Sequence, residues 1–371
     1  MHHCNSSNPV PLKPFSNQSL AEKEVAKELI ILENATSDGP SPSGPIAAGL
    51  SMTLGILSNI VALIILVNAY AHLRRRSKAT FLLFASSLVI TDFAGHVIPG
   101  SLVLRLYLSG GVKDFHSTDP LCQFLGGSMV FFGLCPLFLG SAMAAERCLG
   151  VTRPLLHASL VTTRRTKLSL SFIWLAALCV ALLPCFQLGS YTYQYPGTWC
   201  FIKVLEQTDE ADVAFVMLFS GLGLASLAIA LVCNTISGVT LVLARMRRKP
   251  CNRRLAKSHD IEMVVQLVGI MVTSCICWSP LLIFGLITVT HSYKCRIGDD
   301  LATYKTLMVM GVRLASWNQI LDPWVYILLR RAVLRKIYLI TKREVDLKGS
   351  TLRRWEVNSF PSSEKNAVNR V

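Results

Sequence analysis

Residues 301–340 read LATYKTLMVMGVRLASWNQILDPWVYILLRRAVLRKIYLI, and this stretch decides the fold. From residue 306 to 329 it is almost wholly apolar, and as a helix it is long enough to cross a hydrocarbon layer of roughly 30 Å. Yet it contains Arg313 and Asp322. A charge at the centre of a bilayer costs about 2.5–3.5 kcal/mol or more, so each should face a cavity or a partner. We predict that Arg313 captures the anionic group of a ligand and that Asp322 and the following Pro323 relay the event inward.

The composition of the 371-residue chain indicates a membrane protein. Hydrophobic residues make up 52% of it and charged residues only 16%, which is little charge for a soluble protein. The net charge of +15 would fit nucleic-acid binding, but the basic residues gather in short segments beside apolar runs, as on the cytoplasmic side of membrane proteins. The sequence has no His-Glu-x-x-His motif, no phosphate loop and no cysteine cluster with metal spacing. We therefore expect no enzyme, cofactor or metal site.

Seven apolar runs each reach the roughly 20 residues that a spanning helix needs. They cover residues 46–70, 80–108, 122–145, 168–189, 212–243, 262–290 and 306–329. With an extracellular N-terminus, seven crossings place the main basic clusters inside the cell, together with the C-terminus. We expect an all-α, multi-pass plasma-membrane protein whose seven-transmembrane helix bundle occupies residues 46–330.

The segments on either side of the bundle are polar. Residues 1–45 are expected to form an extracellular tail with three glycosylation sequons. These begin at Asn5, Asn17 and Asn34. Residues 331–342 alternate basic and apolar residues at helical spacing, which predicts a short amphipathic eighth helix on the membrane surface; a frayed extension of the seventh span is the alternative. Residues 343–371 are expected to be a disordered cytoplasmic tail.

Two cysteines differ from the others, most of which lie inside apolar runs. Cys122, at the outer start of the third span, and Cys200, in the loop after the fourth, both fall on the oxidising side of the membrane. We predict that they form a disulfide that ties the loop over the bundle. The same loop is dense in turn formers and aromatic residues, which favours a fixed lid with Thr198 and Trp199 pointing inward.

Polar side chains interrupt the second span. Asp92 is either simply tolerated among hydrogen-bonding neighbours or one half of a buried acidic pair with Asp322, able to hold a proton or a cation. His96 lies four residues on, and thus on the same helix face as Asp92. It is either a satisfied core histidine or, with Tyr107 in the same outward half of the span, a hydrogen-bonding partner of a ligand.

Two further motifs allow a structural and a functional interpretation. Glu146 and Arg147 end the third span, as an ordinary ion pair or as a latch that holds Arg147 until a partner protein takes it. Trp278 and Pro280 lie in the sixth span, where proline is common. They are either packing residues or a hinge about which the inner half of the span swings.

Several motifs stand in order along the chain. They are Asn59, Asp92, Glu146-Arg147-Cys148, Trp174, Cys277-Trp278-Ser279-Pro280 and Asp322-Pro323-Trp324-Val325-Tyr326. This order resembles the rhodopsin-like G-protein-coupled receptors over nearly all of residues 46–340. Glu-Arg-Cys in place of Asp-Arg-Tyr, and Asp322 in place of the usual asparagine, are similar to the prostanoid receptors. So are the sequence GTWC at 197–200 and the sequence RLASWNQILDPW at 313–324.

The resemblance implies a role for each matching residue. Those implied to contact the ligand are Arg313, Tyr107 and Thr198 at a prostaglandin carboxylate, His96 and Ser316 at the ring oxygens, and Met129 along the apolar chain, with Trp199 in the lid. Those implied to act in switching and G-protein coupling are Glu146, Arg147, Trp278, Pro280, Asp92, Asp322 and Tyr326. The implied agonist is prostaglandin E2, with an F-series prostaglandin as the alternative, and the implied partner is a heterotrimeric G protein of the Gq class that mobilises calcium. A lipid or organic-anion transporter is the alternative from another class.

Overall fold

The computed structural model describes residues 44–71, 76–111, 119–205, 208–247, 253–294 and 301–325. Within these ranges, seven long helices follow the order of the predicted spans. They are α2 (Gly44–Ala71), α3 (Arg76–Leu108), α4 (Pro120–Thr152), α6 (Thr163–Ala181), α7 (Glu210–Arg247), α8 (Arg253–Tyr293) and α9 (Leu301–Pro323). The three sequons, Tyr326, the predicted eighth helix and both predicted tails lie outside the described residues, apart from the last two residues of the N-terminal tail.

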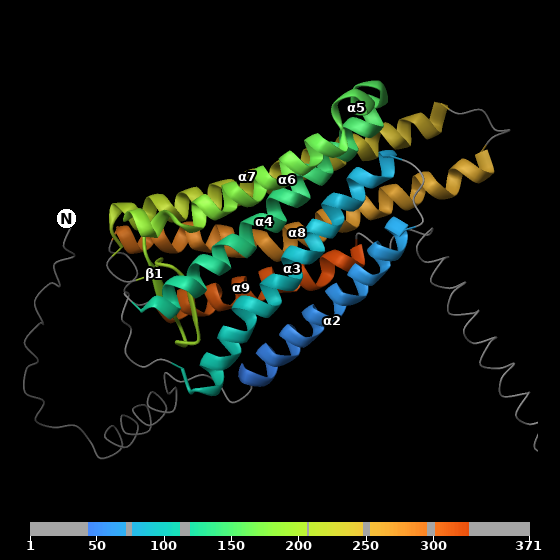
Figure 1. Cartoon of the computed structure of the whole chain (residues 1–371). Helices are drawn as coiled ribbons and strands as arrows, with labels where there is room; N and C mark the ends of the chain where they lie inside the picture. The colour runs from blue at the N-terminus through green and yellow to red at the C-terminus, as the bar shows by residue number, and fades with distance from the viewer. Residues whose placement is uncertain are drawn as a thin grey trace, which may run out of the picture.

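Short elements join the long helices. A one- to two-turn helix, α5 (Pro154–Leu160), follows α4, and a 3-10 turn, η1 (Leu183–Phe186), follows α6. Strands β1 (Tyr191–Gln194) and β2 (Trp199–Ile202) then pair antiparallel as a hairpin. Gly197 in its turn has a φ of 81°, a conformation that side chains other than glycine's resist. The hairpin lies at one end of the bundle and α5 at the other (Figure 1).

Helix α4 is the centre of the bundle. It packs against α3, α6 and α7 and against both strands of the hairpin, while α8 lies between α7 and α9, and α2 packs against α3 and α9 (Figure 1). The side chains of α4 are accordingly among the most buried. Leu125, Val130, Leu134 and Leu139 are fully enclosed. A side chain placed on α4 therefore meets several other helices at once.

The outer surface of the bundle is apolar. Five of the described helices, α2, α3, α4, α7 and α8, are long and apolar enough to cross a membrane. The other two long helices carry charge: α6 begins with basic residues, and α9 contains Lys305, Arg313 and Asp322. Large apolar side chains such as Ile64 and Leu175 are more than half exposed, as expected for surfaces that face lipid tails rather than water.

Candidate ligand-binding site

A cavity of about 600 Å³ opens among the helices near the hairpin. Its walls come from α2, α3, α4, α7, α8 and α9, and β2 contributes Trp199 and Phe201. Most of the wall is apolar, from residues such as Leu54, Val103 and Val309. A cavity of this size, apolar with a few polar groups, is suited to a largely apolar small molecule.

Six of the seven residues predicted to contact a ligand line this cavity. They are Arg313, Tyr107, His96, Ser316, Met129 and Trp199. Thr198 does not belong to its surface. The side chain of Thr198 is completely buried, and its hydroxyl oxygen has no hydrogen-bond partner among the described residues. In this state of the protein, Thr198 therefore lies behind the wall that its neighbour Trp199 presents.

Arg313 is the permanently charged side chain among the described residues that line the cavity. No carboxylate of the described part of the chain pairs with it: the ion pairs found there join Glu146 to His157 and Asp212 to Lys203. The hydroxyl of Ser316 donates to the backbone carbonyl of Arg313 over 2.7 Å. Since no carboxylate of the described chain pairs with the guanidinium, its planar set of donors is left for an incoming carboxylate.

His96 offers a second polar group. Its side chain is 5% exposed, and its Nε2 atom has no hydrogen-bond partner in the described part of the chain. A buried polar atom without a partner is costly, so such atoms in native structures point to a role or an absent ligand. Of the two interpretations of His96, the satisfied core histidine does not describe this geometry, because the ring nitrogen is not satisfied by the described residues.

Glycines create the room for the rings that line the cavity. A Cβ atom at Gly55 would lie 2.3 Å from Nε2 of His96, and one at Gly44 would lie 2.7 Å from the ring of Tyr107. Helix α2 thus approaches α3 closely at both aromatic positions. Sequence reasoning missed these two glycines, because nothing local marks them as contacts between helices.

The inner end of the cavity is formed by aromatic residues. Trp278 is 3% exposed and lies against Gly133, where an added Cβ would be 3.3 Å from the indole ring. Phe201 connects the hairpin to α7, because its ring centroid is 6.1 Å from that of Trp199 and 5.4 Å from that of Phe219. A ligand in the cavity therefore meets Trp278, two residues before the proline of α8. Phe201 and Phe219 carry no sequence signal that would have identified them.

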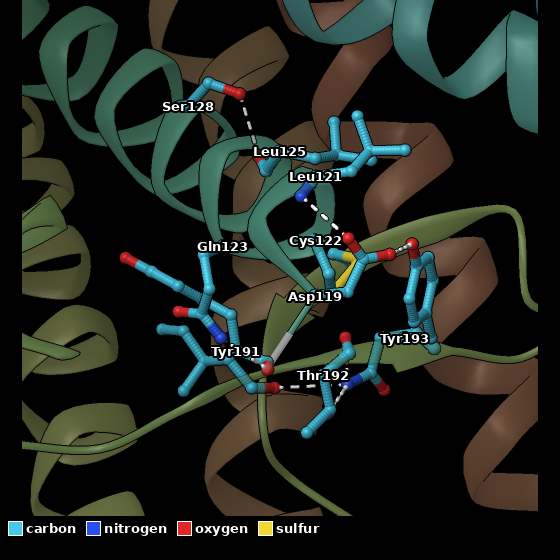
Figure 2. The surroundings of a disulfide bond; sticks show 12 residues. Asp119, Leu121, Cys122, Gln123, Leu125, Ser128, Tyr191, Thr192 and Tyr193 are labelled. Atoms are coloured by element: carbon cyan, nitrogen blue, oxygen red, sulfur yellow. Dashed lines mark hydrogen bonds between the residues drawn. A yellow bond between two sulfur atoms is a disulfide. The ribbon is translucent and has the colours of Figure 1, made fainter. Parts of the chain in front are cut away.

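The hairpin is fixed to α4, as Figure 2 shows around the disulfide. Cys122 and Cys200 are bonded, with Cα atoms 5.4 Å apart, so the predicted disulfide is confirmed. Asp119 caps α4 by accepting a hydrogen bond from the backbone N–H of Leu121, and the hydroxyl of Tyr193 donates to its other oxygen over 2.5 Å. Burial and the Asp119 carboxylate raise the pKa of Tyr193 to about 12, so this phenol stays a hydrogen-bond donor at neutral pH.

The hairpin is also fixed to α6 and α7. The hydroxyl of Tyr191 donates to the backbone carbonyl of Ala181 over 2.8 Å. Asp212 of α7 accepts a hydrogen bond from Ser190 over 2.7 Å and lies 3.6 Å from the ammonium group of Lys203. The segment around the hairpin thus has contacts with three helices, α4, α6 and α7.

A buried polar layer lies deeper in the bundle. Asp92 is completely buried, and none of the residues that the structure describes donates a hydrogen bond to its carboxylate, whereas Asp322 accepts a hydrogen bond of 2.8 Å from Asn318. Asp322 is close enough to act on Asp92 electrostatically. Asn59 donates to the backbone of α2 and, over 3.2 Å, to the carbonyl of Gln319. The layer therefore connects α2, α3 and α9 below the cavity.

At the end of the bundle opposite the hairpin, the predicted neighbours Glu146 and Arg147 have different surroundings. The carboxylate of Glu146 lies 2.9 Å from Nε2 of His157 on α5. The guanidinium of Arg147 lies 5.7 Å from the centre of the Phe81 ring. Glu146 thus pairs with His157 of α5, and the coupling roles expected for Glu146 and Arg147 stay predictions. Nothing in the sequence marked His157 as its partner.

Comparison with known proteins gives consistent results. The family model described as "7 transmembrane receptor (rhodopsin family)" matches residues 58–326. The "Prostaglandin E2 receptor EP1 subtype" of Canis lupus familiaris is 46% identical over 89% of this chain and 91% of the relative, and that of Homo sapiens is 44% identical over 95% and 98%. The "Prostaglandin F2-alpha receptor" of Bos taurus is 44% identical over 93% of both chains. Squid rhodopsin has the same fold, with a TM-score of 0.62 at 17% identity over 80% of this chain and 84% of its own. The predicted seven-transmembrane bundle is thereby confirmed.

Proposed function

Because the chain belongs to the prostanoid receptors of the rhodopsin family, we propose that it is a receptor for prostaglandin E2 that activates a heterotrimeric G protein of the Gq class and so mobilises calcium. Members of this family are receptors, which decides against the enzyme and transporter classes. In this proposal the glycosylated N-terminal tail, with Asn5, Asn17 and Asn34, faces the outside of the cell. The C-terminal tail faces the cytoplasm.

One observation carries the proposal: Arg313 stands in a largely apolar cavity of about 600 Å³ with no carboxylate of the described chain paired to it. Prostaglandins are twenty-carbon acids. A guanidinium binds a carboxylate through two parallel charge-assisted hydrogen bonds, each contributing about 1.5–3 kcal/mol. The apolar chains add about 0.8 kcal/mol for each buried methylene group.

The remaining polar groups of the cavity orient the ligand in this proposal. The imidazole ring of His96, which lines the cavity, bonds an oxygen of the cyclopentane ring, with Ser316 near it, and Tyr107 supports the carboxylate. Met129 and Trp199 enclose the apolar chains. The hydroxyl of Thr198 is buried behind the cavity wall. In this proposal it reaches the ligand's carboxylate only after the residues of that wall have moved.

Activation requires that the agonist bind the active state more tightly than the inactive one. The ligand contacts Trp278 at the inner end of the cavity, and Pro280 interrupts the hydrogen-bond ladder of α8 next to it. We infer that α8 swings outward around Pro280 and that Asp92, Asp322 and Tyr326 relay the change. Arg147 then becomes available to the G protein, while the neighbouring Glu146 stays paired with His157.

The second candidate is a receptor for prostaglandin F2-alpha, since the relatives of that name are similar to this chain to nearly the same extent. Competition binding on membranes that contain the full-length protein distinguishes the two. With labelled prostaglandin E2, we expect unlabelled prostaglandin E2 to compete at least about tenfold more strongly than the F-series ligand, a difference of roughly 1.4 kcal/mol. The reverse order would replace the proposal by the second candidate, and no binding of either would reject both.

The G-protein part of the proposal has its own readout. Prostaglandin E2 should raise inositol phosphate and cytosolic calcium in cells that express the chain, and a Gq inhibitor should abolish both signals. A rise or fall of cyclic AMP without calcium release would assign the receptor to another G-protein class.

A further inference from the structure

The turn of the hairpin contacts the beginning of α9. The ammonium nitrogen of Lys305, near the start of α9, lies 5.5 Å from the centre of the Tyr195 ring. Tyr195 belongs to the turn between β1 and β2 and is 36% exposed. The ion pairs found among the described residues join other side chains, so the ring is the partner that the structure gives to this ammonium group. An ammonium group within about 6 Å of a ring centre is attracted to the face of the ring.

The backbone of Tyr195 also bonds to Trp199. The indole N–H of Trp199 donates to the carbonyl of Tyr195 over 2.8 Å. The backbone N–H of Gly197 donates to the carbonyl of Gln194 over 2.7 Å and closes the turn between the strands. Trp199 in turn lines the agonist cavity. Tyr195 thus contacts α9 through its ring and a wall residue of the cavity through its carbonyl group.

The contact between Lys305 and Tyr195 lies outside the cavity but connects two of its walls. Neither residue lines the cavity, whereas Trp199 of β2 and Arg313 of α9 do. Lys305 lies eight residues before Arg313, which is roughly 12 Å along a helix. The segment around the hairpin is also bonded to α4, α6 and α7. The contact therefore adds α9, the helix of Arg313, to the helices that hold the hairpin.

We propose that Lys305 and Tyr195 form a clasp that holds α9 against the hairpin beside the agonist cavity and thereby slows the release of the bound ligand. The inference rests on the proposed function, because it concerns a ligand in that cavity. A ligand that leaves past the hairpin requires α9 and the hairpin to separate, and this separation breaks the contact between ammonium group and ring. Lys305 and Tyr195 are thus positioning residues, which act on the cavity walls and not on the ligand.

Each half of the clasp has a disruptive and a conservative variant. Lys305→Met keeps the length of the side chain and removes the charge, whereas Lys305→Arg keeps a cation. Tyr195→Leu removes the ring, whereas Tyr195→Phe keeps its face. Lys294→Met is the matched control for the loss of a charge. Lys294 is exposed directly after α8, and the cation–ring contacts found among the described residues do not include it.

The test measures the dissociation of labelled prostaglandin E2 from membranes that contain the full-length protein, after addition of excess unlabelled ligand. We expect dissociation to be about threefold faster in Lys305→Met and in Tyr195→Leu, as the loss of an exposed cation–π contact predicts. Lys305→Arg, Tyr195→Phe and Lys294→Met should release the ligand at the unchanged rate. The double variant Lys305→Met/Tyr195→Leu should also be about threefold faster, because both substitutions remove the same contact.

Unchanged dissociation in Lys305→Met would overturn the clasp, and so would a double variant in which the two single effects multiply. Attraction of the anionic ligand to Lys305 before it binds is the competing explanation. Loss of that attraction would slow association in Lys305→Met and leave Tyr195→Leu unaffected, which would also overturn the clasp. The number of binding sites at saturation shows that each variant is folded.

Hydrogen exchange in the purified, ligand-free protein separates the clasp from the proposed function. We expect the backbone amides of residues 305–310 on α9 to exchange about threefold faster in Tyr195→Leu, although the substituted residue lies in the hairpin. This result without any binding of prostaglandin E2 would support the clasp and reject the proposed function alone. Unchanged exchange in both Tyr195→Leu and Lys305→Met would overturn the clasp. If the receptor proves to bind another prostanoid, that ligand replaces prostaglandin E2 in the dissociation measurement.

Discussion

Gly55 of α2 and His96 of α3 are in such close contact that a Cβ atom at residue 55 would lie 2.3–2.4 Å from three atoms of the imidazole ring. The ring therefore holds its place in the cavity wall because residue 55 has no side chain. Two helices that are otherwise apolar here meet at a polar group, and the absence of one methyl group sets its position.

Gly55→Ala should displace His96 and weaken binding of the agonist by about tenfold or more, because the clash cannot be relieved without moving the ring or α2. Gly49→Ala is the matched control on the same helix: its new Cβ would meet Leu104 at an ordinary 3.9 Å. Saturation binding, normalised to receptor at the cell surface, measures both. Equal affinity in the two variants would contradict the contact.

Arg313→Ala should reduce the affinity for the prostaglandin acid by about a hundredfold or more, since two charge-assisted hydrogen bonds are lost. The methyl ester of the same ligand should bind the variant and the unchanged protein with similar affinity. Arg105→Ala removes an exposed cation from the same end of the bundle, outside the cavity, and should change the affinity of neither ligand. A loss of the same size for acid and ester would exclude Arg313 as the carboxylate's partner.

Cys200→Ser should abolish agonist binding at the cell surface. The disulfide joins residues separated by 78 positions, and a cross-link of this kind typically contributes about 2–4 kcal/mol of stability. It also holds Trp199 and Phe201 at the cavity wall. Cys185→Ser, at an exposed free cysteine shortly before the hairpin, is the control and should bind normally. Undiminished binding by Cys200→Ser would mean that the hairpin keeps its place through its other contacts alone.

Tyr193→Phe should lower the stability of the receptor by about 1 kcal/mol, because Asp119 loses the hydrogen bond from the phenol. The folded-state pKa of Tyr193 is raised to about 12, above its unfolded value of about 10. The stabilisation that the Tyr193 phenol gives to the folded state is therefore fully present below about pH 10, and it is lost as the pH rises through the folded-state pKa. Thermal unfolding of the purified protein should show the same difference between variant and unchanged protein from about pH 6 to pH 9. A difference that disappears within this range would contradict the raised pKa.

The elements that the sequence predicted well are those that depend on a residue's own preference for lipid or water. Seven apolar runs and the basic clusters between them predicted seven long helices in their order. The positions of Cys122 and Cys200 predicted their disulfide, because both fall in segments on one side of the membrane. Hydropathy and the side of the membrane are properties of a single segment, so they can be predicted without knowing the contacts between helices.

The contacts between helices could not be predicted in the same way. A helix that is apolar all round does not specify which face meets which neighbour, so the contact between Gly55 and His96 left no pattern. The pairing of Glu146 with His157 likewise depends on how α5 folds back against α4. Thr198 shows the same limit for loops, since the turn residues that predicted a lid do not specify that its side chain is completely buried.

Cys122 and Asp119 connect one end of α4 to the hairpin, and Glu146 connects the other end to α5. We therefore expect α4 and the hairpin to move as one unit, so that movements of the other helices can be measured relative to it. Spin labels placed in pairs on α4 and on the hairpin should report a distance that agonist leaves unchanged. This constant distance would serve as an internal reference for spectroscopic measurements of the displacement of α8.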